Sequence, residues 1–330
     1  HPQSELSAMN DSVARIESQG CESCKLNQYQ NIDDQYLGGE SVIHSLWTAV
    51  QTLKGEDRFF SIFTSLDDQK SLENLTQRLS GVAHDEAQSL AKHMGHIPTE
   101  KVKRMSARIE KLKDIAWCLQ SEVIDTLEKI RDLSKGLREA PTLSALSMFK
   151  KINAVLNSID RLEVRGRDSA GVSLMFVFTA SEFENLEKSL QQADLIQELN
   201  QRCYPDPLMN RGISIHHSNG DSRKKRIAIA FTYKVAAEVG SLGDNIGYLR
   251  RQIATDSILQ ALSAYSPVND TISAHTRWAS VGAITEANCH PADNQTRENS
   301  SAKNGIIHTC LNGDIDNFQS LKAEFERNGD

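Results

Sequence analysis

The spacing of apolar residues divides the chain into a helical first part and a second part in which strands occur. Through residues 40–162 the apolar positions recur every three or four residues, the period of an amphipathic helix. The clearest stretch, 99–135, begins after Pro98 and ends before Gly136, as helix termini favour. A helix of that length would extend ~55 Å. We therefore expect it to pack antiparallel against a second helix over 67–94.

After about residue 170 the pattern changes to short runs rich in β-branched and aromatic residues, which is typical of strands. A capping box at Ser181–Glu184 predicts that a helix begins there and runs to about Asn200, and 316–327 is amphipathic. Strands are predicted over 172–178, 213–216, 227–231, 271–278 and 306–311. Helices first and mixed strands later favour an α+β fold with a helical lobe.

These patterns predict three regions along the chain. Residues 1–39 form an irregular N-terminal segment, and 40–146 form a helical insertion or arm. Residues 147–330 form the α+β domain.

Composition excludes several classes of function. The chain has 39% hydrophobic and 25% charged residues, an ordinary composition for a globular protein. Its net charge of −7 offers no general basic surface to nucleic acid or to anionic lipid. The chain has no run of about 18 apolar residues that could span a membrane, and residues 1–20 have no apolar core of a signal peptide. We therefore expect a cytoplasmic protein that binds neither nucleic acid nor membrane.

The six cysteines are scattered, so we interpret them as reduced thiols. Cys21 and Cys24 form a C-x-x-C pair, but the second pair of ligands that a zinc site needs is missing. We expect no metal and no cofactor.

Polar residues crowd into three segments in a way that a plain core does not require: 161–172, 275–291 and 304–318. Arg277, at the end of a predicted strand, could receive a small carboxylate with its bidentate guanidinium. Asn312 and Gly313 offer a side-chain amide beside a backbone N–H, the pair that an oxyanion hole needs. The alternative is structural: Arg277 would form an ion pair with Asp168 or Glu286, and Asn312-Gly313 would be only a turn.

In order and together, these segments resemble the glutaminase domain of class II glutamine amidotransferases of the glutamine–fructose-6-phosphate amidotransferase type. The family has R-L-E-Y-R-G-Y-D-S-A-G, H-T-R-W-A-T-H-G, N-x-H-P and H-N-G-I-I-E-N-Y. This chain has R-L-E-V-R-G-R-D-S-A-G at 161–171, H-T-R-W-A-S-V-G at 275–282, N-C-H-P at 288–291 and L-N-G-D-I-D-N-F at 311–318. The resemblance is strong over 152–172 and 271–330.

The resemblance implies an N-terminal-nucleophile αββα sandwich of two sheets between helices, present in part and with a long helical insertion. In that family an N-terminal Cys attacks the amide of glutamine, and the ammonia passes to a sugar-phosphate isomerase-type domain that forms an aminosugar. Arg277 would bind the α-carboxylate of glutamine, with Trp278 and Ser280 in the loop over it. Asn312 and Gly313 would form the oxyanion hole. Framework positions would be Arg165 and Asp168.

The chain also departs from the family pattern. Val281 and Leu311 stand where the family has His, and Ser280 where it has Thr. The opening C-G-I-x-G strand is absent. We therefore expect a truncated or altered member without its nucleophile strand, in which 40–146 is an insertion. Two hypotheses stay open: a glutaminase domain whose parent chain makes aminosugar phosphate, or a non-catalytic amidotransferase-like module whose helical arm mediates assembly, for example as a homo-oligomer.

Overall fold

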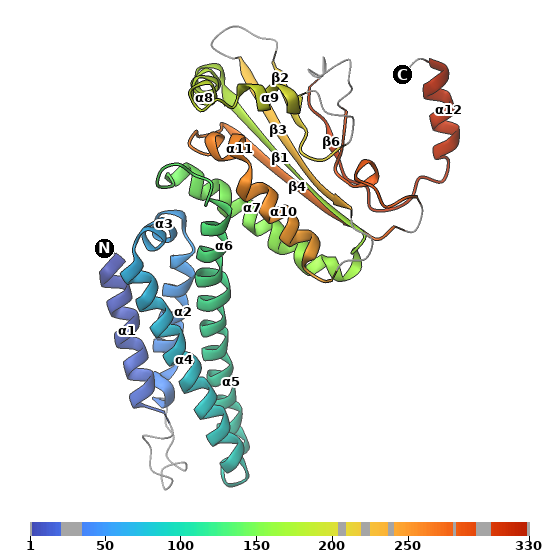
Figure 1. Cartoon of the computed structure of the whole chain (residues 1–330). Coiled ribbons are helices and arrows are strands. Elements are labelled where there is room, and N and C mark those ends of the chain that lie inside the picture. The colour runs from blue at the N-terminus through green and yellow to red at the C-terminus, as the bar shows by residue number, and fades with distance from the viewer. Residues whose placement is uncertain are drawn as a thin grey trace. The chain divides into compact units, whose positions relative to one another are not determined.

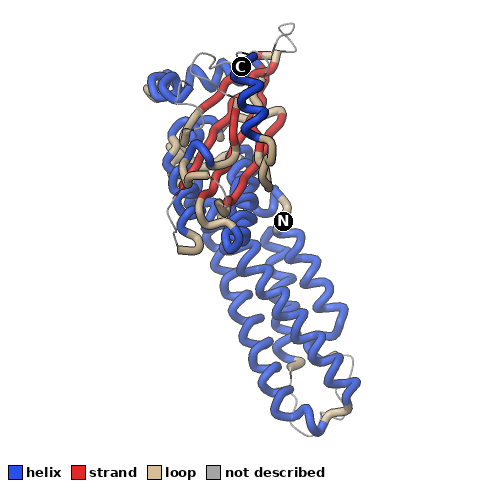
Figure 2. Tube along the Cα trace, turned by 90° about the vertical axis from the view of Figure 1, so that its right-hand side faces the viewer, coloured by secondary structure: helices blue, strands red, loops and turns tan. Residues whose placement is uncertain are grey.

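The computed structural model divides the chain into two compact units, His1–Asp132 and Leu133–Asp330. It describes residues 2–20, 35–203, 209–218, 225–236, 241–279, 282–294 and 305–328. The first unit is built from helices, and the second carries the strands (Figures 1 and 2). No helix in the described part of the chain is long and apolar enough to cross a lipid bilayer.

The first unit is a bundle of helices that run side by side (Figure 1). Its α-helices are α1 (Pro2–Ser18), α2 (Gly39–Leu53), α3 (Glu56–Thr64), α4 (Leu66–His93), α5 (Thr99–Trp117) and α6 (Asp125–Leu133), with a π-helical stretch, η4 (Cys118–Ile124), between α5 and α6. Short 3₁₀ turns, η2 (Tyr36–Gly38) and η3 (Met94–His96), precede α2 and follow α4.

The long helix predicted over 99–135 is confirmed as the succession α5, η4 and α6. A short connection reverses the chain after α4, so α4 and α5 pack antiparallel as expected (Figure 1). Leu79 on α4, Leu112 on α5 and Leu119 in η4 are fully buried. An apolar stripe sustained over this length must be covered, and in this unit the covering surface is the bundle itself.

The prediction that residues 1–39 are irregular was wrong for α1. Leu6, Met9, Val13 and Ile16 are spaced three or four apart and are at most 5% exposed. The bundle, rather than intrinsic propensity, stabilises this helix. Its few apolar residues stand in an otherwise polar sequence, so the pattern did not predict a helix there. Cys21 and Cys24 lie outside the described residues.

The boundary expected between residues 146 and 147 also differs from the structure, where it falls after Asp132. At the start of the second unit, the Nε2 of Gln260 donates to the carbonyl of Leu133 at 2.8 Å. This bond joins the segment that follows α6 to the rest of the second unit.

The second unit contains a four-stranded antiparallel sheet in the order β2-β3-β1-β4. The strands are β1 (Ser169–Thr179), β2 (Ile213–His217), β3 (Arg226–Ala236) and β4 (Asn269–Arg277), and β5 (Ala292–Asp293) pairs with β6 (His308–Thr309). The helices are α7 (Leu143–Leu162), α8 (Ala180–Gln192), α9 (Ile196–Cys203), α10 (Asp244–Thr255), α11 (Ser257–Leu262) and α12 (Phe318–Asn328), with 3₁₀ turns η5 (Glu163–Arg165) and η6 (Glu286–Asn288).

The two faces of this sheet differ in polarity. The even-numbered residues of β1, from Ala170 to Phe178, are apolar and buried, and α7, α8 and α10 pack on the sheet on their side (Figure 1). The odd-numbered positions 169 and 173 are serines, and their neighbour on β3 is the fully buried Lys234. Because side chains alternate along a strand, the opposite face is polar, and Cys289, His290 and His308 lie against part of it.

Asp256 joins three elements on the apolar side. Its carboxylate receives both terminal nitrogens of Arg202 (3.0 and 2.6 Å), the hydroxyl of Tyr233 (2.6 Å) and the N–H groups of Ile258 and Leu259 at the start of α11. These bonds hold the pKa of Asp256 below its usual value, in spite of its burial. Burial and the carboxylate raise the pKa of Tyr233, so the phenol keeps the proton that it donates.

The residue that caps α8 is Thr179 and not Ser181. The Thr179 hydroxyl accepts from the backbone N–H of Glu182 and contacts the Glu182 carboxylate. The capping box therefore lies two residues earlier, in Thr179–Glu182, because β1 runs directly into the helix. The predicted helix to residue 200 is also broken, between α8 and α9.

Leu112→Asp tests whether the stripe of the long helix holds the bundle together. Leu112 is 0% exposed, so the substitution buries a carboxylate and should lower the free energy of unfolding by about 3 kcal/mol or more. Ala107→Asp is the matched control, because residue 107 is exposed on the same helix. Thermal and urea unfolding followed by circular dichroism would measure both. Equal melting of the two variants would show that the stripe is not a packed seam.

Candidate functional site

The first two polar segments of the sequence meet where β1 begins and β4 ends. Ser169 on β1 pairs with Arg277 on β4. The backbone N–H of Asp168 donates to the carbonyl of Arg277 at 3.1 Å, and the carboxylate of Asp168 accepts from the N–H of Ala279. A Cβ on Gly166 would lie 2.9 Å from the backbone of Thr276. The segments therefore touch through their backbones, and a side chain at 166 would separate them.

The end of the second segment lies against the polar face of the sheet at Gly171. A Cβ at this position would lie 2.1 Å from the carbonyl oxygen of His290 and 3.3 Å from the sulfur of Cys289. The thiol of Cys289 donates to the carbonyl of Ala170 at 3.1 Å. The chain at 289–291 can cross β1 only because β1 has no side chain there.

Beyond this crossing, the 305–313 segment is attached by side-chain hydrogen bonds. The ring Nδ1 of His290 accepts from the N–H of Leu311 at 3.0 Å, and Nδ1 of His308 pairs with the hydroxyl of Ser173 on β1. β5 and β6 pair between these two points. Asn312 is thereby brought to the end of the sheet where Arg277 lies.

A pocket of about 490 Å³ opens at this place, a volume in the range of small-molecule sites. It brings together five of the residues singled out in the sequence: Arg165, Arg277, Trp278, Asn312 and Gly313. Its other walls include Thr276, Ala287, Asn288, Ala292 and Leu311. Asp168 does not line it and instead fixes the loop after β4 through Ala279. Ser280 lies outside the described residues.

Arg277 brings a permanent positive charge to the pocket wall. Its Nη1 donates to the carbonyl of Ala283 at 3.4 Å, which turns the guanidinium toward the loop that begins at Gly282. The two carboxylates considered as its ion-pair partners make other hydrogen bonds. Asp168 accepts from the backbone N–H of Ala279, and Glu286 accepts from the backbone N–H of Asn210.

Two histidines, His275 and His290, complete the polar wall, with ring centroids 4.9 Å apart. Burial lowers the pKa of His275, and nearby His290 and Arg277 lower it further. Burial and Arg277 likewise lower the pKa of His290. Both rings are therefore neutral at pH 7 and offer hydrogen bonds without charge. The sequence motifs assigned a role to neither histidine, although His275 stands two residues before Arg277 and so shares its face of β4.

None of the four described cysteines is an activated thiol, and none lines this pocket. Burial and Glu122 raise the pKa of Cys118 to about 11, and burial raises that of Cys203 to about 11. Burial also raises the pKa of Cys289 and of Cys310. Because the thiolate is the nucleophile, the described residues provide binding groups at this pocket but no thiol poised for attack.

Comparison with known proteins identifies one related segment. The chain is 47% identical over 55 residues to the glutamine–fructose-6-phosphate aminotransferase (isomerizing) of Bradyrhizobium diazoefficiens, a match that covers 17% of this chain and 7% of that protein. No family model and no solved structure matches the chain. A part of this chain is therefore related to that aminotransferase, and the match spans only a small fraction of either protein.

Gly171→Ala tests the crossing of the loop over β1. Its Cβ would meet a backbone oxygen, so either the 289–291 segment or β1 must move, and we expect a loss of about 2–4 kcal/mol in stability. Gly247→Ala in α10 is the control, because its Cβ would meet only an ordinary contact at 3.5 Å and alanine favours a helix by about 1 kcal/mol. Urea unfolding measures both. A Gly171→Ala protein as stable as the parent would contradict the close crossing.

Proposed function

We propose that the second unit is an amidotransferase-related glutaminase domain and that the pocket beside Arg277 binds L-glutamine. The observation that carries this proposal is that Arg277 and the pair Asn312-Gly313, far apart in sequence, line one pocket. A glutamine molecule needs a cation for its α-carboxylate and hydrogen-bond donors for its amide oxygen. The relative named above acts on glutamine according to its name, which agrees with the proposal.

Arg277 would hold the α-carboxylate, because a guanidinium can give two parallel hydrogen bonds to it. Trp278, which is 69% exposed, and Ser280 would close over the bound amino acid. At the other end, the side-chain amide of Asn312 and the N–H of Gly313 would receive the oxygen that becomes negative when the amide is attacked. The φ of Gly313 is +142°, a conformation that a residue with a side chain adopts at a cost.

An N-terminal-nucleophile fold is the architecture that we propose for this unit. It is supported by the antiparallel sheet with helices on its apolar face and a polar opposite face. In such a fold a second sheet would cover the polar face, and the short β5–β6 pair would belong to that layer. In the parent protein, ammonia would pass to a sugar-phosphate isomerase-type domain for aminosugar phosphate synthesis in the cytoplasm.

The state of the thiols supports a second candidate, a non-catalytic amidotransferase-like module. The described cysteines all have raised pKa values, and Leu311 provides an apolar side chain at the pocket wall. In this function the pocket would bind glutamine without hydrolysing it, and the helical bundle would mediate assembly.

Arg277→Gln tests glutamine binding in either case. Loss of the charged fork should weaken L-glutamine by about 10- to 100-fold, the equivalent of about 1.5–3 kcal/mol, in isothermal titration calorimetry. Arg277→Lys should recover only part of the affinity, because lysine keeps the charge but not the planar fork. Arg161→Gln, at an exposed position of α7, should bind like the parent. Equal affinity in the parent and in Arg277→Gln would remove the carboxylate site.

Glutamine hydrolysis separates the two candidates. We predict that the 330-residue chain binds L-glutamine but releases no ammonia above the buffer background, because no described thiol is both near the pocket and ionised. A coupled ammonia assay, with and without prior alkylation by iodoacetamide, would measure this. Release that alkylation abolishes would show that one of the six cysteines is a working nucleophile and would favour the glutaminase.

A further inference from the structure

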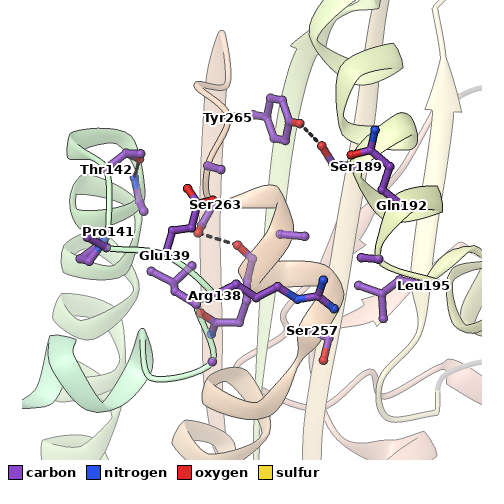
Figure 3. A pocket seen from close by; sticks show the side chains of 18 residues that line it. Arg138, Glu139, Pro141, Thr142, Ser189, Gln192, Leu195, Ser257, Ser263 and Tyr265 are labelled. Atoms are coloured by element: carbon purple, nitrogen blue, oxygen red, sulfur yellow. Dashed lines mark hydrogen bonds between the residues drawn. The ribbon is translucent and has the colours of Figure 1, made fainter.

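A second pocket, of about 360 Å³, lies in the second unit and shares no lining residue with the first. Its walls come from the segment 136–145, from the end of α8 and the turn after it, and from 257–265 (Figure 3). Tyr265 precedes β4, whereas Arg277 ends it. The nine residues of that strand therefore separate the two pockets by roughly 30 Å.

Hydrogen bonds and a close backbone contact fix the walls of this pocket. The hydroxyl of Ser144 donates to the carbonyl of Tyr265 at 3.0 Å, and the hydroxyls of Ser189 and Tyr265 lie 2.5 Å apart. Gln260 bonds to the carbonyl of Leu133, and a Cβ on Gly136 would meet the carbonyl of Ala254 at 2.8 Å. The segment that carries Arg138 is therefore anchored at both of its ends.

Arg138 and Glu139, adjacent residues of opposite charge, line the pocket without forming an ion pair with each other. Arg138 and Glu139 form neither a hydrogen bond nor an ion pair with any residue that the structure describes, and the same holds for the hydroxyl of Ser257. Figure 3 shows the guanidinium of Arg138 extended across the pocket toward Ser257 and Leu195. One ligand in this pocket could therefore meet the guanidinium of Arg138 and the hydroxyl of Ser257 with one group, and the carboxylate of Glu139 with another.

The remaining walls are mixed, with polar side chains such as Thr142, Gln192 and Gln260 beside a set of apolar ones. Small and aliphatic side chains from all three stretches face the same space: Leu137, Ala140, Pro141, Ala145, Ala193, Leu195, Ala261 and Ala264. Such a lining suits a short hydrocarbon chain, whose burial is favourable by about 0.8 kcal/mol for each CH₂ group.

We propose that this pocket binds a small aliphatic amino acid as a zwitterion. The carboxylate would be held by the guanidinium of Arg138 and the hydroxyl of Ser257, and the ammonium group by the carboxylate of Glu139. The side chain would lie against Leu195. This site is independent of the glutamine pocket proposed above.

The test uses the full chain and L-leucine as the probe, in isothermal titration calorimetry at millimolar concentration. Arg138→Gln and Glu139→Gln should each raise the dissociation constant at least tenfold, while Arg161→Gln and Arg277→Gln should leave it unchanged. Two analogues check the zwitterion: 4-methylpentanoate lacks the ammonium group, and 3-methylbutylamine lacks the carboxylate. Both should bind at least tenfold more weakly than leucine.

Four results would overturn the proposal. They are no binding of leucine, equal binding by the parent and Arg138→Gln, binding of 4-methylpentanoate as tight as that of leucine, and binding that depends on Arg277 but not on Arg138. Arg138 and Glu139 are exposed, so their substitution should leave folding intact. Unchanged circular dichroism of both variants would verify that a lost affinity is not a lost fold.

Discussion

The close approach of residues 289–291 to Gly171 is the constraint on which the candidate site depends. Without a side chain on β1 at this point, the backbone of His290 can rest on the sheet. His290 in turn accepts the hydrogen bond of Leu311, and the next two residues are Asn312 and Gly313. One missing side chain therefore determines how near Asn312 and Gly313 come to Arg277, although Gly171 itself does not line the pocket.

On the apolar face of the sheet, the hydrogen bonds of Asp256 hold three elements in place. Asp256 collects charged and neutral donors from α9, β3 and α11 in a place where it is 0% exposed. A buried carboxylate is tolerated only when its oxygens are satisfied, so the three elements have little freedom to slide. Because the apolar face is fixed in this way, the sheet tolerates serines, histidines and a buried lysine on its other face. Polar groups on that face contribute little to stability.

Sequence predicted the elements with strong periodicity and missed features that depend on tertiary contact. The spacing of apolar residues predicted the α4–α5 pairing and all four strands of the main sheet, because each of these elements buries apolar residues at a regular interval. The helix α1 was missed because its few apolar residues stand in a polar sequence and the bundle stabilises it. The boundary after Asp132 was missed because the contacts of the next segment, such as that of Leu133 with Gln260, are far apart in sequence. The residues of the pocket could be named from motifs, but the pairing of His275 with His290 required the crossing at Gly171. No motif pointed to Arg138 and Glu139.

At the Arg277 pocket, the proposed binding of glutamine and the hydrolysis of its amide would require different groups of the protein. Holding a carboxylate and an amide oxygen requires only fixed donors, and the backbone contacts at Gly166 and Gly171 place them. Attack on the amide requires a thiolate as well. A thiol with a pKa near 11, as in Cys118 and Cys203, is ionised in only about one molecule in 10⁴ at pH 7. Catalysis at this pocket would therefore need a thiol whose environment differs in kind from those of the described cysteines: exposed to the pocket, beside a base, and free of the burial that raises their pKa values.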